Sequence, residues 1–283
     1  MKIEPLDLSH QALLTARFSK LHLDISEYSF ANCYLFRKVH EYEIVFDKEI
    51  FIRGKTYDGL RFLMPTFDIR NVEYAYLKTV LQENQMLFPI PEEWANSFSK
   101  EQFSQAFFER DSDYIYALQK IREMPGRHLS SRRNLIRQFC DLYSVTVESL
   151  TNERKKDAIA VLEAWEKHEA SSSEKTDFEE CHEAISRMEQ LGLQGTLYLV
   201  DDKPVGFIIG EAISPHMFAL HFAKACVDYK GVYQYMYQSF AKRVDDRFEF
   251  LNWEQDLGKE GLKKSKSAYQ PDRFSKKIRL TSK

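Results

Sequence analysis

Polar side chains that could accept a proton beside an anionic ligand are concentrated near the C-terminal end of the sequence. The alternating segment 248–252 predicts a short strand, and four polar residues lie within five positions at its end. They are Asn252, Glu254, Gln255 and Asp256. Gly258 then interrupts the chain, and a segment of helical character carries Lys263 and Lys266. A strand end with carboxylates and amides beside a cationic helix brings a proton acceptor close to an anionic ligand.

Acyl transfer from an ester requires a nucleophile, an acceptor for its proton and stabilisation of the tetrahedral oxyanion. We expect Glu254 or Asp256 to act as the base or to hold an ammonium group of the donor. Candidates for contact with the oxyanion are Asn252, Gln255 and Lys266. If extended geometry persists beyond the strand, Asn252, Glu254 and Asp256 point to one side. A structural role is the alternative, with the carboxylates fixing the Gly258 turn and pairing with Lys263 or Lys266.

A second cationic segment lies between residues 124 and 140, which include four arginines and no acidic residue. Ser130 or Ser131 is expected to cap a helix there, and a helix N-terminus with arginines is a suitable anion site. The residues assigned to anion binding are Arg127, Arg132, Arg133 and Asn134. A surface helix with a solvated basic face is the alternative.

The segment 252–271 resembles the C-terminal signature of a bacterial family related to the cytosolic, C-terminal domain of phosphatidylglycerol lysyltransferases. Segments 26–32, 111–116 and 126–139 also match that family, in the family's order. Lys263 stands where the family commonly has arginine, which weakens the case for bidentate anion binding at this position.

The resemblance implies an α/β (α+β) fold with two tandem GNAT-like halves, each a mixed sheet flanked by helices. The expected halves are residues 1–147 and 148–283, the second of which carries the signature. The family also implies an aminoacyl-tRNA-dependent acyltransferase, with a tRNA acceptor end or an anionic lipid headgroup as partner. Further residues assigned to substrate or anion binding are Gly231, Lys263, Lys266 and Tyr269.

Patterns along the chain are compatible with this fold. Alternating runs predict an antiparallel meander in the first half and a hairpin in the second. The meander comprises 41–46, 49–53 and 60–65, and the hairpin comprises 196–200 and 204–211. A helix is expected over 100–109, and another is expected to begin near Ser26 with its hydroxyl as the cap. The order of elements in the second half is similar to that of the GNAT fold, although no sequence repeat demonstrates a duplication.

The donor can be argued from the turn that precedes the predicted helix 229–243. Acetyl-CoA enzymes of this fold hold pyrophosphate in a glycine-rich loop at that place. Here Gly231 stands alone between Tyr229 and Tyr233, which leaves fewer free backbone N–H groups for pyrophosphate. Aminoacyl-tRNA is therefore favoured over acyl-CoA. A CoA-dependent N-acyltransferase and a non-catalytic binder of an anion or nucleotide are the alternatives.

Composition limits the remaining choices. The chain has 283 residues, 43% hydrophobic residues and a formal net charge of -3, which is typical of a folded globular protein. Segment 257–283 contains nine Lys and Arg residues against two acidic residues, and this basic tail suits an anionic partner. Four scattered cysteines provide neither metal-site spacing nor a disulfide framework. With no signal segment and no long apolar run, a cytoplasmic location is expected. The amino acid, the acceptor and the oligomeric state remain open.

Overall fold

The computed structural model describes residues 1–81, 86–169 and 176–283, and the chain forms two compact units. Unit 1 contains Met1–Tyr114, Glu254–Lys266 and Arg273–Lys283; unit 2 contains Ile115–Trp253 and Ser267–Asp272. This division differs from the expected boundary between residues 147 and 148. Most of the C-terminal signature therefore belongs to the unit built by the N-terminal part of the chain, because it folds back onto that part.

Unit 1 is built on a seven-stranded sheet, as far as the described residues show. In spatial order its strands are β1 (Lys2–Pro5), β2 (Glu43–Phe46), β3 (Ile50–Lys55), β4 (Arg61–Pro65), β5 (Met86–Pro91), β14 (Lys277–Ser282) and β6 (Phe103–Phe107). The predicted meander is confirmed, because β2, β3 and β4 pair antiparallel. Strands β4 and β5 pair in parallel, so the sheet is mixed.

The last strand of the chain lies inside this sheet. Strand β14 pairs antiparallel with β5 on one side and with β6 on the other. The predicted helix over 100–109 is therefore wrong, because Phe103–Phe107 extends along β14. Tertiary pairing with a segment more than 160 positions away overrides the local preference of these residues.

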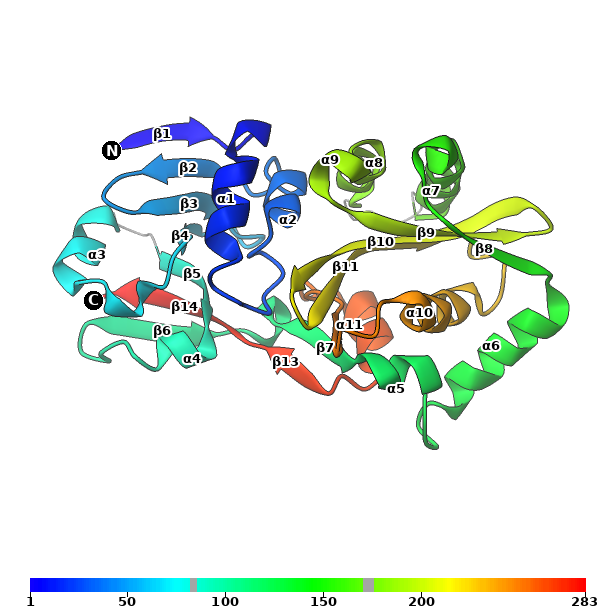
Figure 1. Cartoon of the computed structure of the whole chain (residues 1–283). Coiled ribbons are helices and arrows are strands. Elements are labelled where there is room, and N and C mark those ends of the chain that lie inside the picture. The colour runs from blue at the N-terminus through cyan, green and yellow to red at the C-terminus, as the bar shows by residue number, and fades with distance from the viewer. Residues whose placement is uncertain (82–85, 170–175) are drawn as a thin grey trace. The chain divides into compact units, whose positions relative to one another are not determined.

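Short helices accompany the unit 1 sheet (Figure 1). They are α1 (Gln11–Phe18), α2 (Phe30–Leu35), α3 (Tyr74–Val80) and α4 (Glu92–Ala95). Helix α11 (Glu260–Ser267) also belongs to unit 1, except for its last residue. Helix α2 begins at Phe30 because the Ser29 hydroxyl accepts a hydrogen bond from the Asn32 amide at 3.2 Å. The predicted cap at Ser26 is thus wrong by three residues.

Within unit 2 the strands of the second mixed sheet follow the order β7-β12-β11-β10-β9-β8, and β7 contributes only its residues from Ile115 onward. Their bounds are β7 (Asp113–Ala117), β8 (Val145–Ser149), β9 (Gln194–Val200), β10 (Lys203–Ser214), β11 (Met217–Ala225) and β12 (Phe250–Asn252). The predicted hairpin is confirmed as the antiparallel pair β9–β10. Strands β11 and β12 pair in parallel over three residues, whereas β12 and β7 pair antiparallel.

Helices cover both faces of the unit 2 sheet. One face carries α7 (Lys155–Glu169), α8 (Phe178–Ser186) and α9 (Met188–Leu191), and the other carries α5 (Leu118–Glu123), α6 (Ser130–Leu142) and α10 (Val232–Arg243) (Figure 1). The predicted α/β class is confirmed, because each of the two mixed sheets is flanked by helices. Among the helices of the described residues, none is long and apolar enough to cross a membrane.

Candidate functional site

Three segments that are distant in sequence meet in the interior of unit 1. Segments 26–32 and 111–114 meet the start of the C-terminal signature, residues 254–256, and hydrogen bonds connect each pair of segments directly or through a lysine. The sequence matches that were separate along the chain thus form one polar network.

Lys277 is the cation at the centre of this network. Its side chain is 0% exposed, and Nζ lies 2.6 Å from Glu27 Oε2 and 2.6 Å from Asp113 Oδ1. Nζ also donates a hydrogen bond to the amide oxygen of Gln255. Burial opposes the charge of Lys277, but Asp113 and Glu27 outweigh burial and raise the pKa of Lys277. The ammonium group therefore remains charged.

Glu27 is a buried carboxylate of the network, and its pKa is raised. Burial raises the pKa of Glu27 to about 7, with Asp113 adding to the effect and Lys277 opposing it. Asp113 is fully buried and is bonded differently, since its Oδ2 accepts from the Ser26 amide at 2.8 Å. A carboxyl group that titrates near neutral pH can accept or release a proton during a reaction.

Asp256 closes the turn that follows β12. Its Oδ1 accepts from the Gly258 amide at 2.8 Å and its Oδ2 accepts from the Tyr114 hydroxyl at 2.6 Å, and the residue is 1% exposed. Leu257 and Gly258 have positive φ values of 58° and 74°, so the turn needs such a fixation. These contacts favour the structural role for Asp256.

Glu254 departs from strand geometry, with a φ of 57°. Its Oε1 accepts from Asn32 Nδ2 at 2.9 Å. Strand β12 ends at Asn252, which is fully buried in unit 2 and lies in register with Ile115 and Ala219. The expected continuation of one strand face through Asn252, Glu254 and Asp256 is therefore wrong, because the left-handed residue breaks the alternation.

The two lysines of the signature have different environments. Lys266 Nζ donates to the backbone oxygens of Gln255 at 2.6 Å and Glu254 at 3.2 Å. Burial lowers the pKa of Lys266 to about 8, against the opposing effect of Glu254. Lys263 instead pairs with Glu109 at 3.3 Å on the surface of the unit.

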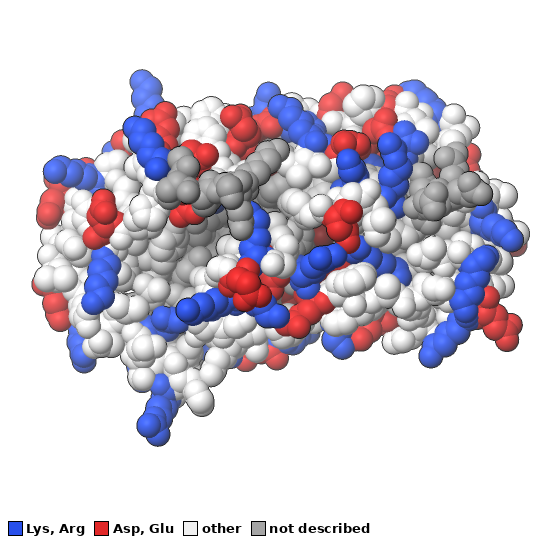
Figure 2. All heavy atoms as spheres, turned by 180° about the vertical axis from the view of Figure 1, so that it is seen from behind, with Lys and Arg blue, Asp and Glu red and all other residues white. Residues whose placement is uncertain are grey.

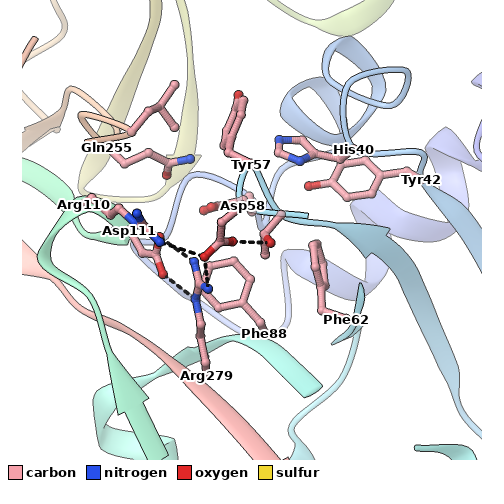
Figure 3. A pocket seen from close by; sticks show the side chains of 13 residues that line it. His40, Tyr42, Tyr57, Asp58, Phe62, Phe88, Arg110, Asp111, Gln255 and Arg279 are labelled. Atoms are coloured by element: carbon pink, nitrogen blue, oxygen red, sulfur yellow. Dashed lines mark hydrogen bonds and ion pairs between the residues drawn. The ribbon is translucent and has the colours of Figure 1, made fainter. Parts of the chain in front are cut away.

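A cavity of about 150 Å³ lies beside the network in unit 1 (Figure 3). Glu27 and two residues of the signature, Gln255 and Leu257, line it. Its aromatic walls are His40, Tyr42, Tyr57, Phe62 and Phe88, and its remaining lining residues are Thr56, Asp58, Arg110, Asp111 and Arg279. Burial lowers the pKa of His40, so the imidazole is uncharged at neutral pH.

Two arginines and two aspartates form a closed ion cluster at one side of the cavity (Figure 3). Arg279 donates to Asp111 at 2.7 and 3.0 Å and to Asp58 at 2.8 Å, while Arg110 donates to Asp58 at 2.7 Å. Burial alone would raise the pKa of Asp58, but Arg279, Thr56 and Arg110 hold it at about 2. The four charges cancel, so this cluster contributes no net charge to the cavity.

The arginine segment lies in unit 2, on α6 and the turn before it. Arg133 Nη1 donates to the backbone oxygens of Met124 and Gly126, so it fixes that turn. Arg132 lies over the Tyr269 ring, with 5.7 Å from Cζ to the ring centroid. Its Nε is buried and has no hydrogen-bond partner among the described residues. The Arg132 side chain is half-buried, and Arg133 Nη1 is occupied by the two carbonyl groups of the turn.

Other predicted residues of unit 2 have local partners. Arg127 is exposed, and its carbonyl accepts from the Ser130 hydroxyl at 2.6 Å. Ser130 is the first residue of α6, and Leu129 precedes it without a side-chain cap, so the predicted serine cap is wrong. Asn134 accepts from Arg137 in the next turn of the helix. Tyr269 is 2% exposed and packs with Trp253 at 4.9 Å between ring centroids.

Gly231 has a packing role in the structure. It precedes α10 with a φ of 93°, and a Cβ atom there would lie 2.5 Å from the backbone oxygen of Leu135. Glycine is therefore required by the close approach of α6 and by the backbone conformation. Tyr229 packs on Tyr143 of the segment after α6, with 5.1 Å between ring centroids.

Sequence reasoning assigned no site role to the charged residues at the cavity or beside it, among them Glu27, Lys277 and Arg279. The last two had been counted in the basic tail, but they are 0% and 4% exposed and paired with acids. Their alternation with Ile278 and Leu280 is a strand signal that could have identified β14. On the face displayed in Figure 2, basic and acidic side chains are interspersed.

The model of the family described as "Phosphatidylglycerol lysyltransferase, C-terminal" matches residues 18–281. A conserved protein of unknown function from Bacteroides thetaiotaomicron VPI-5482 is similar in structure, with a TM-score of 0.88 and 23% identity over 100% of both chains. The C-terminal domain of a putative lysylphosphatidylglycerol synthetase from Agrobacterium fabrum has a TM-score of 0.67 and 11% identity, covering 97% of this chain and 92% of that one.

L-PGS from Bacillus licheniformis has a TM-score of 0.61 and 12% identity, covering 98% of this chain and 92% of that one. No curated protein matches the chain in sequence.

Proposed function

The chain belongs to the phosphatidylglycerol lysyltransferase C-terminal family, and from this membership we propose that it is an aminoacyl transferase. It moves an aminoacyl group from aminoacyl-tRNA to an amine or hydroxyl acceptor such as a lipid headgroup or a small molecule. The observation that carries the proposal is the convergence of segments 26–32, 111–114 and 254–256 on one buried network beside the cavity of unit 1.

Polar groups of the signature have distinct roles in this proposal. Gln255 lines the cavity, and its neighbour Glu254 is the carboxylate of the pair that retains partial exposure, so Glu254 holds the ammonium group of the donor. Asp256 shapes the turn through Gly258 and Tyr114. Most of the rate enhancement of such a site comes from positioning the ester and the nucleophile, because an aminoacyl ester is already activated.

The environment of α10 supports aminoacyl-tRNA over acyl-CoA as the donor. The backbone of α6 approaches Gly231 closely, and Tyr229 packs on Tyr143. The turn before α10 is therefore engaged in packing at the place where an open glycine-rich loop would hold pyrophosphate. In unit 2, Arg132 supplies the candidate contact for a phosphate of the tRNA.

The experiment is a transfer assay with purified full-length protein. Transfer RNA charged with a mixture of radiolabelled amino acids is incubated with phosphatidylglycerol vesicles, with small primary amines or with buffer, and labelled products are separated by chromatography. We expect a new labelled lipid or amide that depends on the protein. A parallel reaction with labelled acetyl-CoA tests the CoA-dependent alternative.

A variant of Glu254 tests the site, and Glu93→Gln is its matched control. Glu254→Gln should abolish product formation, whereas Glu93→Gln at an exposed position of unit 1 should leave it unchanged. Acetylated product in place of aminoacyl product would reject the donor assignment. Binding of uncharged tRNA or vesicles without any transfer would instead indicate a non-catalytic binder.

A further inference from the structure

The cavity of unit 1 has a surplus of negative charge. Three carboxylates line it, those of Glu27, Asp58 and Asp111, against the two guanidinium groups of Arg110 and Arg279. The ion cluster cancels Asp58 and Asp111, so Glu27 supplies the surplus. Glu27 shares the ammonium group of Lys277 with Asp113, each at 2.6 Å, so these three groups together carry one net negative charge.

Aromatic rings complete the lining on the side away from the arginines. Tyr57 and His40 pack edge to face at 4.6 Å between centroids, and His40 stacks on Tyr42 at 5.2 Å. A pocket with one net negative charge and several aromatic walls is complementary to an organic cation, through ion pairing and cation–π contacts. The guanidinium of Arg279 lies over Phe88 at 5.3 Å, so aromatic faces here already hold a cation.

We propose that this cavity binds the primary ammonium group of an acyl acceptor, with Glu27 as its counter-ion and as the acceptor of its proton. The inference rests on the proposed transferase function and specifies its acceptor as a small primary amine. A cavity of about 150 Å³ admits the end of such a molecule and excludes a bulky headgroup.

Transfer of the aminoacyl group to the amine involves two proton transfers. The ammonium group gives one proton to the Glu27 carboxylate, and the neutral amine nitrogen attacks the ester carbonyl carbon of the donor. A C–N bond forms, the C–O bond to the tRNA ribose breaks, and a second proton passes from nitrogen to the departing ribose oxygen. The products are an amide, free tRNA and protonated Glu27, which returns its proton to solvent.

Burial, Lys277 and Asp113 together set the protonation of Glu27. Burial and Asp113 raise the pKa of Glu27 to about 7, so the carboxyl accepts a proton near neutral pH and gives it up again. The ionisable groups around Glu27 are Lys277 on β14, Asp113 on β7, and Tyr28, Cys33, His40 and Tyr42 in segment 28–42. Burial raises the pKa of both tyrosines well above its ordinary value, so they stay neutral.

Binding of n-butylammonium chloride to the full chain tests the site without any donor. Isothermal titration calorimetry should give a Kd on the order of 1 mM. n-Butanol, which has the same shape and no charge, should bind at least tenfold more weakly. Affinity for the cation should rise by about tenfold from pH 6 to pH 8 as Glu27 ionises, because the amine remains protonated over that range.

Glu27→Gln should weaken n-butylammonium at least tenfold and remove the pH dependence, while Glu93→Gln should match the unchanged protein. If Glu27→Gln fails to fold, Tyr57→Ala takes its place. Tyr57 is 52% exposed at the cavity, so its removal should weaken the cation severalfold without unfolding the chain. Equal binding of n-butanol, or unchanged binding to these variants, would overturn the site.

The transfer assay separates this inference from the proposed function. Amide formation with n-butylamine that is lost in Glu27→Gln supports both. Aminoacyl transfer to another acceptor that persists in Glu27→Gln would overturn the inference and keep the function. Glu27-dependent binding without transfer from any donor would overturn the function and keep the site. Tighter binding of alanine amide than of n-butylammonium would assign the cavity to the donor and overturn the acceptor assignment.

Discussion

Lys277 Nζ lies 2.6 Å from Asp113 Oδ1, and both side chains are 0% exposed. Residues from the last strand of the chain and from the start of β7 thus form a buried ion pair next to the candidate site. Glu27 shares the same ammonium group at 2.6 Å. The pair holds the C-terminal segment against segment 26–32, so the geometry of the cavity wall depends on it.

Removal of the buried cation should be strongly destabilising. Lys277→Met leaves Asp113 buried without its counter-charge, and we expect a loss of about 3–5 kcal/mol in the free energy of unfolding. Urea denaturation followed by circular dichroism measures it. Lys276→Met is the matched control, because Lys276 pairs with Glu92 at the surface and should contribute about 0–1 kcal/mol. Equal losses in the two variants would contradict a buried ion pair.

Substitution of Asp256 should reduce stability, whereas substitution of Glu254 should abolish transfer. Asp256→Ala removes the acceptor of Tyr114 and of the Gly258 amide, and we expect a loss of stability of about 2–4 kcal/mol. Glu254→Gln retains an oxygen for Asn32 and should leave the melting temperature unchanged while transfer is lost. Tyr114→Phe should reproduce part of the Asp256→Ala loss. If Asp256→Ala folds with normal stability and lacks only transfer, Asp256 is catalytic after all.

Titration of Lys266 should appear in the pH dependence of stability. Its pKa in the folded state is about 8, against 10.5 for the ordinary side chain. Between these values the unfolded chain binds more protons, so the free energy of unfolding should gain about 1–2 kcal/mol as the pH rises. Lys266→Arg stays charged and should lack this gain, which urea titrations at pH 7.5 and 10 would reveal. Lys264→Arg, at an exposed position, should retain it.

Substitution of Arg132 should affect ligand binding, whereas substitution of Arg133 should affect stability. Arg132→Gln should weaken tRNA binding and lower its salt dependence, since the half-buried guanidinium group of Arg132 is the candidate contact for a phosphate. Arg133→Gln should instead lower stability by about 1–2 kcal/mol, because Arg133 fixes the carbonyls of Met124 and Gly126. Filter binding at two salt concentrations and thermal melts measure both. Reversal of the two phenotypes would place the anion on Arg133.

Close packing at Gly231 provides a test with an internal reference. Gly231→Ala meets both a left-handed backbone and the Leu135 oxygen at 2.5 Å, whereas Gly126→Ala meets a φ of 78° and open space. Backbone strain of about 1–2 kcal/mol is common to both, and the contact should add about 1–3 kcal/mol in Gly231→Ala. Thermal denaturation compares the two. A similar loss in both variants would show that α6 does not constrain the α10 turn.

Elements that depend on local patterns of apolar residues are predicted correctly from the sequence. Alternation identified β2, β3 and β4 and the β9–β10 hairpin, because one face of each strand is buried and the pattern of apolar residues records it. Matches in segments 26–32, 111–116 and 252–271 identified the family that the family model also matches. They marked the polar segments that meet in unit 1.

Burial of the charged residues Lys277 and Arg279 follows from tertiary strand pairing and could not be predicted from local patterns. Lys277 and Arg279 look like part of a basic tail, but β14 inserts between β5 and β6 and buries both against acids. Strand pairing between distant segments depends on hydrogen bonds that no local pattern encodes, and the same pairing made Phe103–Phe107 a strand. Glu254 has a left-handed backbone conformation, which ends the strand-like alternation of side chains after β12. Its contacts with Asn32 and Lys266 are tertiary, so the local sequence pattern does not predict this conformation.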